Sequence, residues 1–117
     1  MARVLVVDDN DLLRGMLRRF FETEDFGVTT AIDGEDGLEQ FHRQRFDIVI
    51  CDIFMLNKGG LVVIQSIRSL APEVPIIVMT AAELTGTQIE SVLGPIPTIA
   101  KPFRPRQLLT LVRECLP

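Results

Sequence analysis

Polar side chains able to bind an ion or a phosphate oxygen stand directly after four apolar segments of the chain. They are Asp8 and Asp9 after residues 4–7, Asp52 after 48–51, Thr80 after 76–79 and Lys101 after 98–100. If the ends of these segments met, three carboxylates, one hydroxyl and one ammonium group would form a single site.

The three carboxylates predict a bound cation. Gathered in one pocket they would repel one another, and some would take up protons unless a positive charge joined them. Mg²⁺ suits a small carboxylate set that leaves positions for water and phosphate. Mg²⁺ alone does not account for Thr80 and Lys101. A phosphoryl group does, because its oxygens need positive charge and a hydroxyl donor, and an aspartate can itself accept it as an acyl phosphate.

The apolar segments are typical of strands that alternate with amphipathic helices. We expect strands at residues 4–7, 28–31, 48–51, 76–79 and 98–100, and helices at 12–21, 33–41, 61–67, 83–93 and 105–116. This alternation favours a parallel sheet, because each crossover helix has to cover a sheet face. Pro97 suits an edge position for the last strand. Ligands of open α/β sheets bind at the carboxyl ends of the strands, so the polar residues are predicted to form one site.

Length and composition indicate one ordinary domain, expected to cover residues 1–117. Hydrophobic residues make up 47% of the chain, enough for a core, and the formal net charge of −4 argues against a nucleic-acid-binding surface. No segment approaches the roughly 20 apolar residues that span a bilayer, and no signal peptide is visible. We therefore expect a cytoplasmic protein without a membrane partner. Cys51 and Cys115 lack metal-type spacing and are expected to be reduced and structural.

Several short motifs, in order along the whole chain, resemble the receiver domain of two-component response regulators. They are Val6-Val7-Asp8-Asp9, Asp33-Gly34-Glu35, residues 47–52 with Met55 and Gly60 downstream, Met79-Thr80-Ala81, Gly94 and Lys101-Pro102-Phe103. Each motif alone is weak, whereas their common order and spacing is specific. The resemblance implies a flavodoxin-like, doubly wound α/β fold with five parallel strands in the order 2-1-3-4-5 and helices on both faces.

The resemblance also implies roles for the polar residues in phosphoryl transfer. Asp52 would accept a phosphoryl group from the phosphohistidine of a histidine kinase. Thr80 would donate its hydroxyl to a phosphoryl oxygen and shift position on activation, and Lys101 would pair with the phosphoryl group. Pro102 resembles the proline that follows a cis Lys–Pro bond in this family.

For Mg²⁺, the resemblance implies a ligand set that includes the phosphoacceptor. Asp9 and Asp52 would bind the ion directly, and Asp8 would bind it mainly through water. The backbone carbonyl of Phe54 would complete the protein ligands.

A phosphorylation-dependent signalling switch is the function that the resemblance implies, not an enzyme beyond catalysis of its own phosphorylation and dephosphorylation. Its partners would be a sensor histidine kinase or phosphotransfer protein and a downstream effector or fused output domain. The resemblance is also compatible with a phosphorylation-linked homodimer. Because the chain ends at Pro117, just after the last predicted helix, we expect no output domain within it.

The sequence departs from the family pattern at three places. Thr98 replaces the usual aromatic switch residue, Leu56 replaces a frequent proline, and residues 94–97 replace a commoner small, acidic stretch. We interpret these differences as changes in output. Phe54 and Ala82 flank the approach of water in this family, and two apolar side chains there predict slow self-dephosphorylation.

Other readings fit parts of the sequence. Thr98 and Leu56 are compatible with a pseudo-receiver that binds partners without taking phosphate. The segment Asp9-Asn10-Asp11 would suit a haloacid-dehalogenase-like phosphatase, although Leu13 stands where that motif has Thr or Val, and the chain lacks room for a cap domain. Asp8-Asp9 alone would also suit a helix N-terminus. The arginines at 14, 18, 19, 43 and 45 are expected on solvated helix faces.

Overall fold

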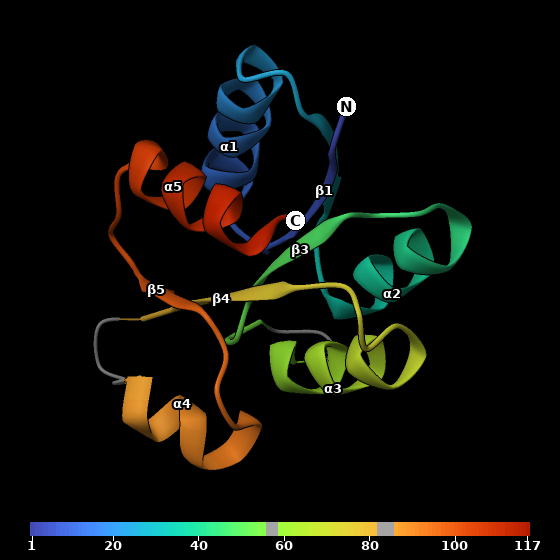
Figure 1. Cartoon of the computed structure of the whole chain (residues 1–117), viewed down its shortest axis with the longest axis vertical. Helices are drawn as coiled ribbons and strands as arrows, with labels where there is room; N and C mark the ends of the chain where they lie inside the picture. Colours follow the sequence, from blue (N-terminus) through green and yellow to red (C-terminus); the bar gives the residue numbers. More distant parts are fainter. Residues whose placement is uncertain (56–58, 82–85) are drawn as a thin grey trace.

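Strands and helices alternate along the chain, as the apolar pattern predicts (Figure 1). The computed structural model describes residues 1–55, 59–81 and 86–117. Its strands are β1 (Arg3–Val7), β2 (Gly27–Ala31), β3 (Ile48–Asp52), β4 (Ile76–Thr80) and β5 (Thr98–Ala100). Its helices are α1 (Asp11–Thr23), α2 (Gly34–Arg43), α3 (Gly60–Leu70), α4 (Gly86–Leu93) and α5 (Pro105–Cys115).

The strands form one parallel sheet in the order β2-β1-β3-β4-β5, which confirms the predicted fold class. β1 lies between β2 and β3, with Val7 opposite both Ala31 and Cys51. β4 lies between β3 and β5, with Thr80 opposite Ala100. This register places the carboxyl ends of β1, β3, β4 and β5 at one edge of the sheet, where the candidate residues follow.

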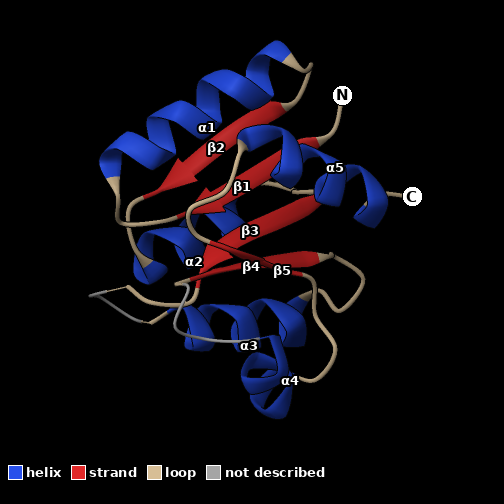
Figure 2. Ribbon diagram, turned by 90° about the vertical axis from the view of Figure 1, so that its left-hand side faces the viewer, coloured by secondary structure: helices blue, strands red, loops and turns tan. Residues whose placement is uncertain are grey.

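Two separate cores cover the two faces of the sheet (Figure 2). One core joins the strands to residues of α2, α3 and α4, and the other joins them to α1 and α5. Neighbouring strand residues alternate between the cores, so Leu5 packs into the first and Val6 into the second. β3 and β4 are buried along their whole length, which explains why all their residues before Asp52 and Thr80 are apolar.

Short polar side chains cap the first two helices. Asn10 accepts a hydrogen bond from the Leu13 amide at the start of α1, and Asp33 accepts one from the Asp36 amide at the start of α2. Asp and Asn are preferred at this position because their side-chain oxygen accepts a hydrogen bond from a backbone amide of the first turn. The last strand pairs only with β4, and Pro97 immediately precedes it, as expected for an edge strand.

Some expectations fall outside the described residues. Leu56, Ala82 and the first residues of the helix predicted at 83–93 are among them, and the described part of that helix is α4. Among the described helices none is long and apolar enough to cross a membrane. Cys51 and Cys115 are free thiols.

Gly60 allows α3 to begin against the backbone of the segment that follows β3. A Cβ atom at this position would lie 2.0 Å from the carbonyl oxygen of Asp52 and 2.6 Å from the Cα of Ile53. Because the atoms it would meet are backbone, no side-chain rotation can relieve the overlap. Gly60 therefore sets how closely α3 approaches Asp52.

Replacement of Gly60 by Ala is expected to lower the free energy of unfolding by about 2 kcal/mol, because the new methyl group overpacks this contact. Gly15→Ala is the matched control, since a Cβ there meets nothing within 4 Å. It should raise the free energy of unfolding by about 0.5–1 kcal/mol. Urea unfolding followed by circular dichroism measures both, and equal stability of Gly60→Ala and wild type would contradict the contact.

Candidate metal and phosphoryl site

Three carboxylates meet at the carboxyl edge of the sheet. Asp8 follows β1, Asp9 comes next, and Asp52 ends β3, and one carboxylate oxygen from each lies within 4.8 Å of the others. Asp8 is fully buried and Asp52 is 5% exposed, whereas Asp9 faces solvent. The adjacency of β1 and β3 in the sheet brings these residues together, as the sequence predicts.

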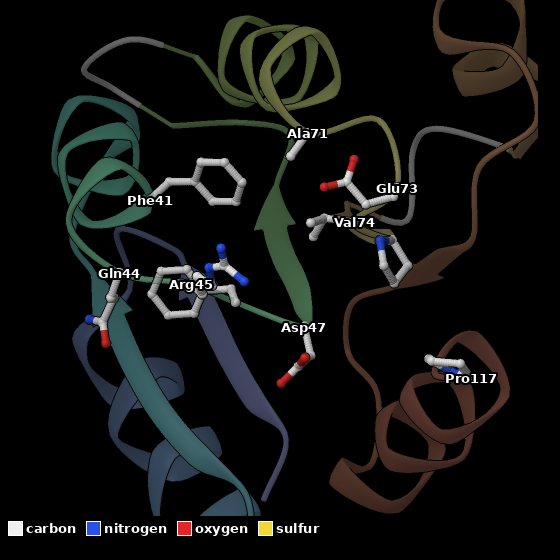
Figure 3. Close-up of a pocket in the computed structure, with 10 residues that line it drawn as sticks. Phe41, Gln44, Arg45, Asp47, Ala71, Glu73, Val74 and Pro117 are labelled. Atoms are coloured by element: carbon white, nitrogen blue, oxygen red, sulfur yellow. The ribbon is translucent and has the colours of Figure 1, made fainter.

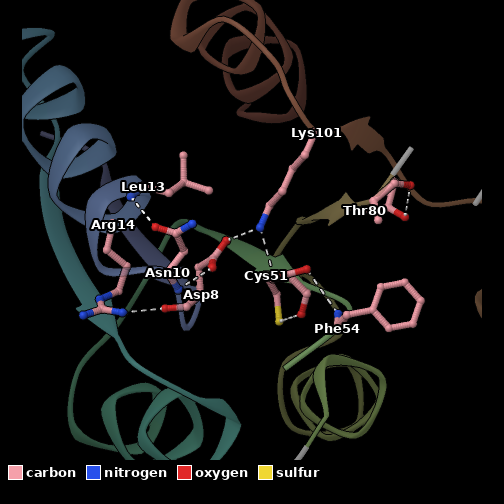
Figure 4. A network of polar contacts seen from close by, with 10 residues as sticks. Asp8, Asn10, Leu13, Arg14, Cys51, Phe54, Thr80 and Lys101 are labelled. Carbon is pink, nitrogen blue, oxygen red and sulfur yellow. Dashed lines mark hydrogen bonds and ion pairs between the residues drawn. The ribbon is translucent and has the colours of Figure 1, made fainter. Parts of the chain in front are cut away.

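Lys101 bridges the two buried carboxylates (Figure 4). Its Nζ lies 2.7 Å from Oδ2 of Asp8 and 3.0 Å from Oδ2 of Asp52. The backbone amide of Lys101 donates to the Thr80 carbonyl at 2.7 Å, so the residue continues the pairing of β5 with β4. The Lys101–Pro102 peptide bond is cis, as the resemblance implies.

Backbone amides occupy the other oxygens of the two buried carboxylates. The Asn10 amide donates to Oδ1 of Asp8 at 2.9 Å, and the Phe54 amide donates to Oδ1 of Asp52 at 3.1 Å. Among the described residues, no hydrogen bond or ion pair engages the carboxylate of Asp9. Asp9 is thus the carboxylate of the three that is most available to a new ligand.

Burial and charge shift the ionisation of the site in definite directions. Burial raises the pKa of Asp52, with a smaller contribution from the charge of Asp8, and the hydrogen bonds from Lys101 and Phe54 only partly oppose it. Burial lowers the pKa of Lys101, but hydrogen bonds to Asp8 and Asp52 outweigh it and leave that pKa raised. Lys101 is therefore held as a cation.

Thr80 lies at the same edge but outside this network. Its side chain is 3% exposed, and its hydroxyl donates to the Ala81 carbonyl at 3.2 Å (Figure 4). The predicted bond from Thr80 to a phosphoryl oxygen would require this hydroxyl to turn away from Ala81. Cys51 directly precedes Asp52 in β3 and is buried. Burial strongly raises the pKa of its thiol and keeps the thiol protonated.

One arginine was wrongly expected on a solvated helix face. The side chain of Arg14 is only 14% exposed, and its guanidinium donates to the Asp8 carbonyl at 2.9 Å. Arg18, Arg19 and Arg43 are exposed on helices as predicted, whereas Arg45 is exposed but lies beyond the end of α2. Periodicity alone does not separate Arg14 from these residues, because its partner is a backbone atom at the end of a strand.

Another hollow lies away from the acidic site, beside the amino ends of β3 and β4 (Figure 3). It has a volume of about 520 Å³ and is lined by Phe41, Gln44, Arg45, Phe46, Asp47, Ala71, Glu73, Val74, Pro75 and Pro117. A smaller hollow of about 360 Å³ adjoins the acidic site and includes Asp9, Phe54 and Met55. We assign function to the acidic edge because three carboxylates and the ammonium group of Lys101 converge there.

The donor set fits Mg²⁺. Carboxylate oxygens are hard ligands, and an ammonium group already stands between two of them, so the cluster demands positive charge. Asp9 faces solvent beside that pair, so its carboxylate is accessible to an incoming ion. The additional ligand role predicted for the Phe54 carbonyl stays a prediction.

Comparison with known proteins places this geometry in one family. The family model described as "Response regulator receiver domain" matches residues 4–113. The chain is 33% identical to the transcriptional regulatory protein DltR of Streptococcus agalactiae over 112 residues, 95% of this chain and 50% of that protein. The chain therefore spans about half the length of this curated relative.

Two solved structures share the fold over nearly their whole length. Chemotaxis protein CheY4 of Vibrio cholerae has a TM-score of 0.90 and 29% identity, with 99% of each chain covered. Response regulator TrrA of Thermotoga maritima, in complex with Mg²⁺ and BeF, has a TM-score of 0.86 and 31% identity, with 99% of this chain and 100% of that chain covered. Receiver domains bind Mg²⁺ at an acidic pocket of the kind formed here by Asp8, Asp9 and Asp52.

Asp52→Asn is expected to stabilise the Mg²⁺-free protein at pH 7. The pKa of Asp52 is raised by folding, so its negative charge destabilises the fold above that pKa. This penalty disappears as the pH falls below the pKa of the unfolded chain, so the gain should vanish below about pH 3.8, the ordinary value for an aspartate. Urea unfolding across pH measures it, with Glu90→Gln, on the exposed surface of α4, as the control. A pH-independent difference, or a less stable variant at pH 7, would contradict the assignment.

Proposed function

Because the chain belongs to the response regulator receiver domain family, we propose that Asp52 accepts a phosphoryl group from the phosphohistidine of a histidine kinase. Phosphorylation-based switching in two-component systems is the general function of this family. The observation that supports Asp52 as the acceptor is the bridge from Lys101 to Asp8 and Asp52, beside the available carboxylate of Asp9.

The residues around Asp52 suit an in-line transfer. An oxygen of Asp52 attacks the phosphorus atom, the P–N bond to the kinase histidine breaks, and its electron pair stays on the imidazole ring. The Phe54 amide orients the attacking carboxylate, and Lys101 moves part of its charge from Asp52 to a phosphoryl oxygen. Asp9, Asp52, the Phe54 carbonyl and, through water, Asp8 would hold Mg²⁺. When bound, this ion neutralises the phosphoryl oxygens and the carboxylates.

Phosphorylation would then shift the domain between two conformations with different partners. Thr80 ends β4, the strand between Asp52 and the edge strand β5. If its hydroxyl rotated toward a phosphoryl oxygen, the change would be passed on to the paired residues Thr98–Ala100. Since Thr98 replaces an aromatic residue there, we propose that output depends more on the backbone of β5 and the turn at 94–97 than on a rotating ring.

The proposed partners follow from the family and the relatives. They are a sensor histidine kinase or phosphotransfer protein in the cytoplasm and an effector or output domain, with a phosphorylation-linked homodimer as a further form. DltR is named a transcriptional regulatory protein, and the chain matches half of it, so a DNA-directed output would come from another segment or protein. Beyond catalysis of its own phosphorylation and dephosphorylation we propose no enzymatic activity.

Phosphorylation by acetyl phosphate tests the proposal directly. With Mg²⁺, the intact mass should increase by one phosphoryl group, and neither Asp52→Asn nor wild type without Mg²⁺ should show the increase. Mass is the readout because the chain has no Trp for fluorescence. If neither acetyl phosphate nor a kinase donor gives an adduct, the chain acts as a pseudo-receiver.

The phosphoaspartate is expected to persist for hours after the donor is removed. Phe54 is 56% exposed beside Asp52 and presents no polar group to orient an attacking water. Phe54→Gln should speed the loss of the phosphoryl group, because its amide can bind that water. Mass spectra taken over time after donor removal follow both proteins. Decay of the wild type within minutes would contradict the expectation.

A further inference from the structure

Arg14 is a largely enclosed cation at the edge of the acidic site, with a side chain that is 14% exposed. It has two hydrogen-bond partners, of which Figure 4 shows Asp8. Its Nη1 donates to the carbonyl oxygen of Asp8 at 2.9 Å, and its Nη2 donates to Oδ1 of Asp11 at 2.5 Å. The side chain of Asp11 is 88% exposed, so the bond to the Asp8 carbonyl is the more enclosed of the two, and both bonds together orient the guanidinium. The first turn of α1 therefore presents a fixed hydrogen-bond donor to the end of β1.

The carbonyl that Arg14 binds belongs to the peptide unit joining Asp8 to Asp9. Because a peptide unit is planar, the position of its oxygen also fixes the direction in which the Asp9 backbone leaves. Every other polar group of Asp8 is held as well, its amide by the Ala31 carbonyl at 3.2 Å and its carboxylate by Asn10 and Lys101. Asp9 has no such restraint on its carboxylate among the described residues, so its orientation depends on this peptide.

We propose that Arg14 is a positioning residue of the metal site, which holds the Asp8–Asp9 peptide so that the Asp9 carboxylate faces the ion. This role rests on the proposed Mg²⁺ site. Arg14 does not touch the ion or the phosphoryl group. It acts on Asp9 through one backbone hydrogen bond.

The charge of Arg14 and its geometry act on Mg²⁺ affinity in opposite directions. A positive charge close to the carboxylates repels Mg²⁺, so its removal alone would tighten Mg²⁺ binding. Loss of the hydrogen bond to Asp8 frees the Asp9 peptide and weakens binding, and groups that orient metal ligands typically contribute about 10-fold or more to affinity. The direction of the change therefore separates a positioning residue from a simple nearby charge.

Titration of the phosphate-free protein with Mg²⁺ tests the proposal, with amide NMR shifts giving the dissociation constant. Arg14→Met removes both donors at similar length and is expected to weaken Mg²⁺ binding about 10-fold. Arg18→Met is the matched control, because Arg18 lies one turn later on α1 and is exposed, and its hydrogen bond goes to the Thr30 hydroxyl at 3.5 Å. It removes the same charge without touching Asp8, and its affinity should equal or slightly exceed that of wild type.

A second pair of variants keeps the charge constant. Arg14→Lys should bind Mg²⁺ more weakly than Arg18→Lys, because one ammonium cannot reach both Asp8 and Asp11 in the geometry of a guanidinium. This pair decides the question if circular dichroism shows that Arg14→Met is unfolded. The proposal is overturned if the folded Arg14 variants bind Mg²⁺ as tightly as their Arg18 counterparts, or more tightly. If the wild type fails to bind Mg²⁺, the proposed metal site itself is wrong.

Discussion

The structure depends on the neutralisation of two buried carboxylates at adjacent strand ends. Asp8 and Asp52 share the edge between β1 and β3, where their charges repel and water is largely excluded. A single ammonium group, that of Lys101, holds both. Breaking such a pair by removing one partner leaves an uncompensated buried charge, so the strand that carries Lys101 is fixed in place by the electrostatics of the site.

This charge pairing connects the carboxyl ends of β1, β3 and β5 across the sheet. Lys101 follows β5, which is separated from β3 by β4, and the long lysine side chain crosses that distance to reach both carboxylates. Backbone amides of Asn10 and Phe54 satisfy the remaining carboxylate oxygens. The loops after β1 and β3 are thereby held by the same charges that would bind a cation. A bound ion and a phosphoryl group would therefore act on contacts that already organise these loops.

The acidic site also lowers the folding stability of the domain. Folding raises the pKa of Asp52, which means that the ionised carboxylate needed for phosphoryl transfer is unfavourable where it stands. The apolar cores on the two faces of the sheet and the close approach of α3 at Gly60 oppose this strain. A cation bound beside Asp9 would relieve the repulsion, so ligand binding and folding stability are coupled at this edge.

The sequence by itself determined the element types, the parallel sheet and the convergence of Asp8, Asp9, Asp52, Thr80 and Lys101 on one edge. The spacing of apolar residues and the polar residue at the end of each strand are local features of the sequence. Once the strands are parallel, their carboxyl ends lie at one edge of the sheet, and the polar residues meet there. Only the tertiary structure decided that Lys101 bridges two carboxylates, that Thr80 bonds Ala81, and that Arg14 bonds the backbone of Asp8. Those contacts depend on distances between segments far apart in sequence, or on backbone atoms that every residue shares, and residue types alone do not encode either.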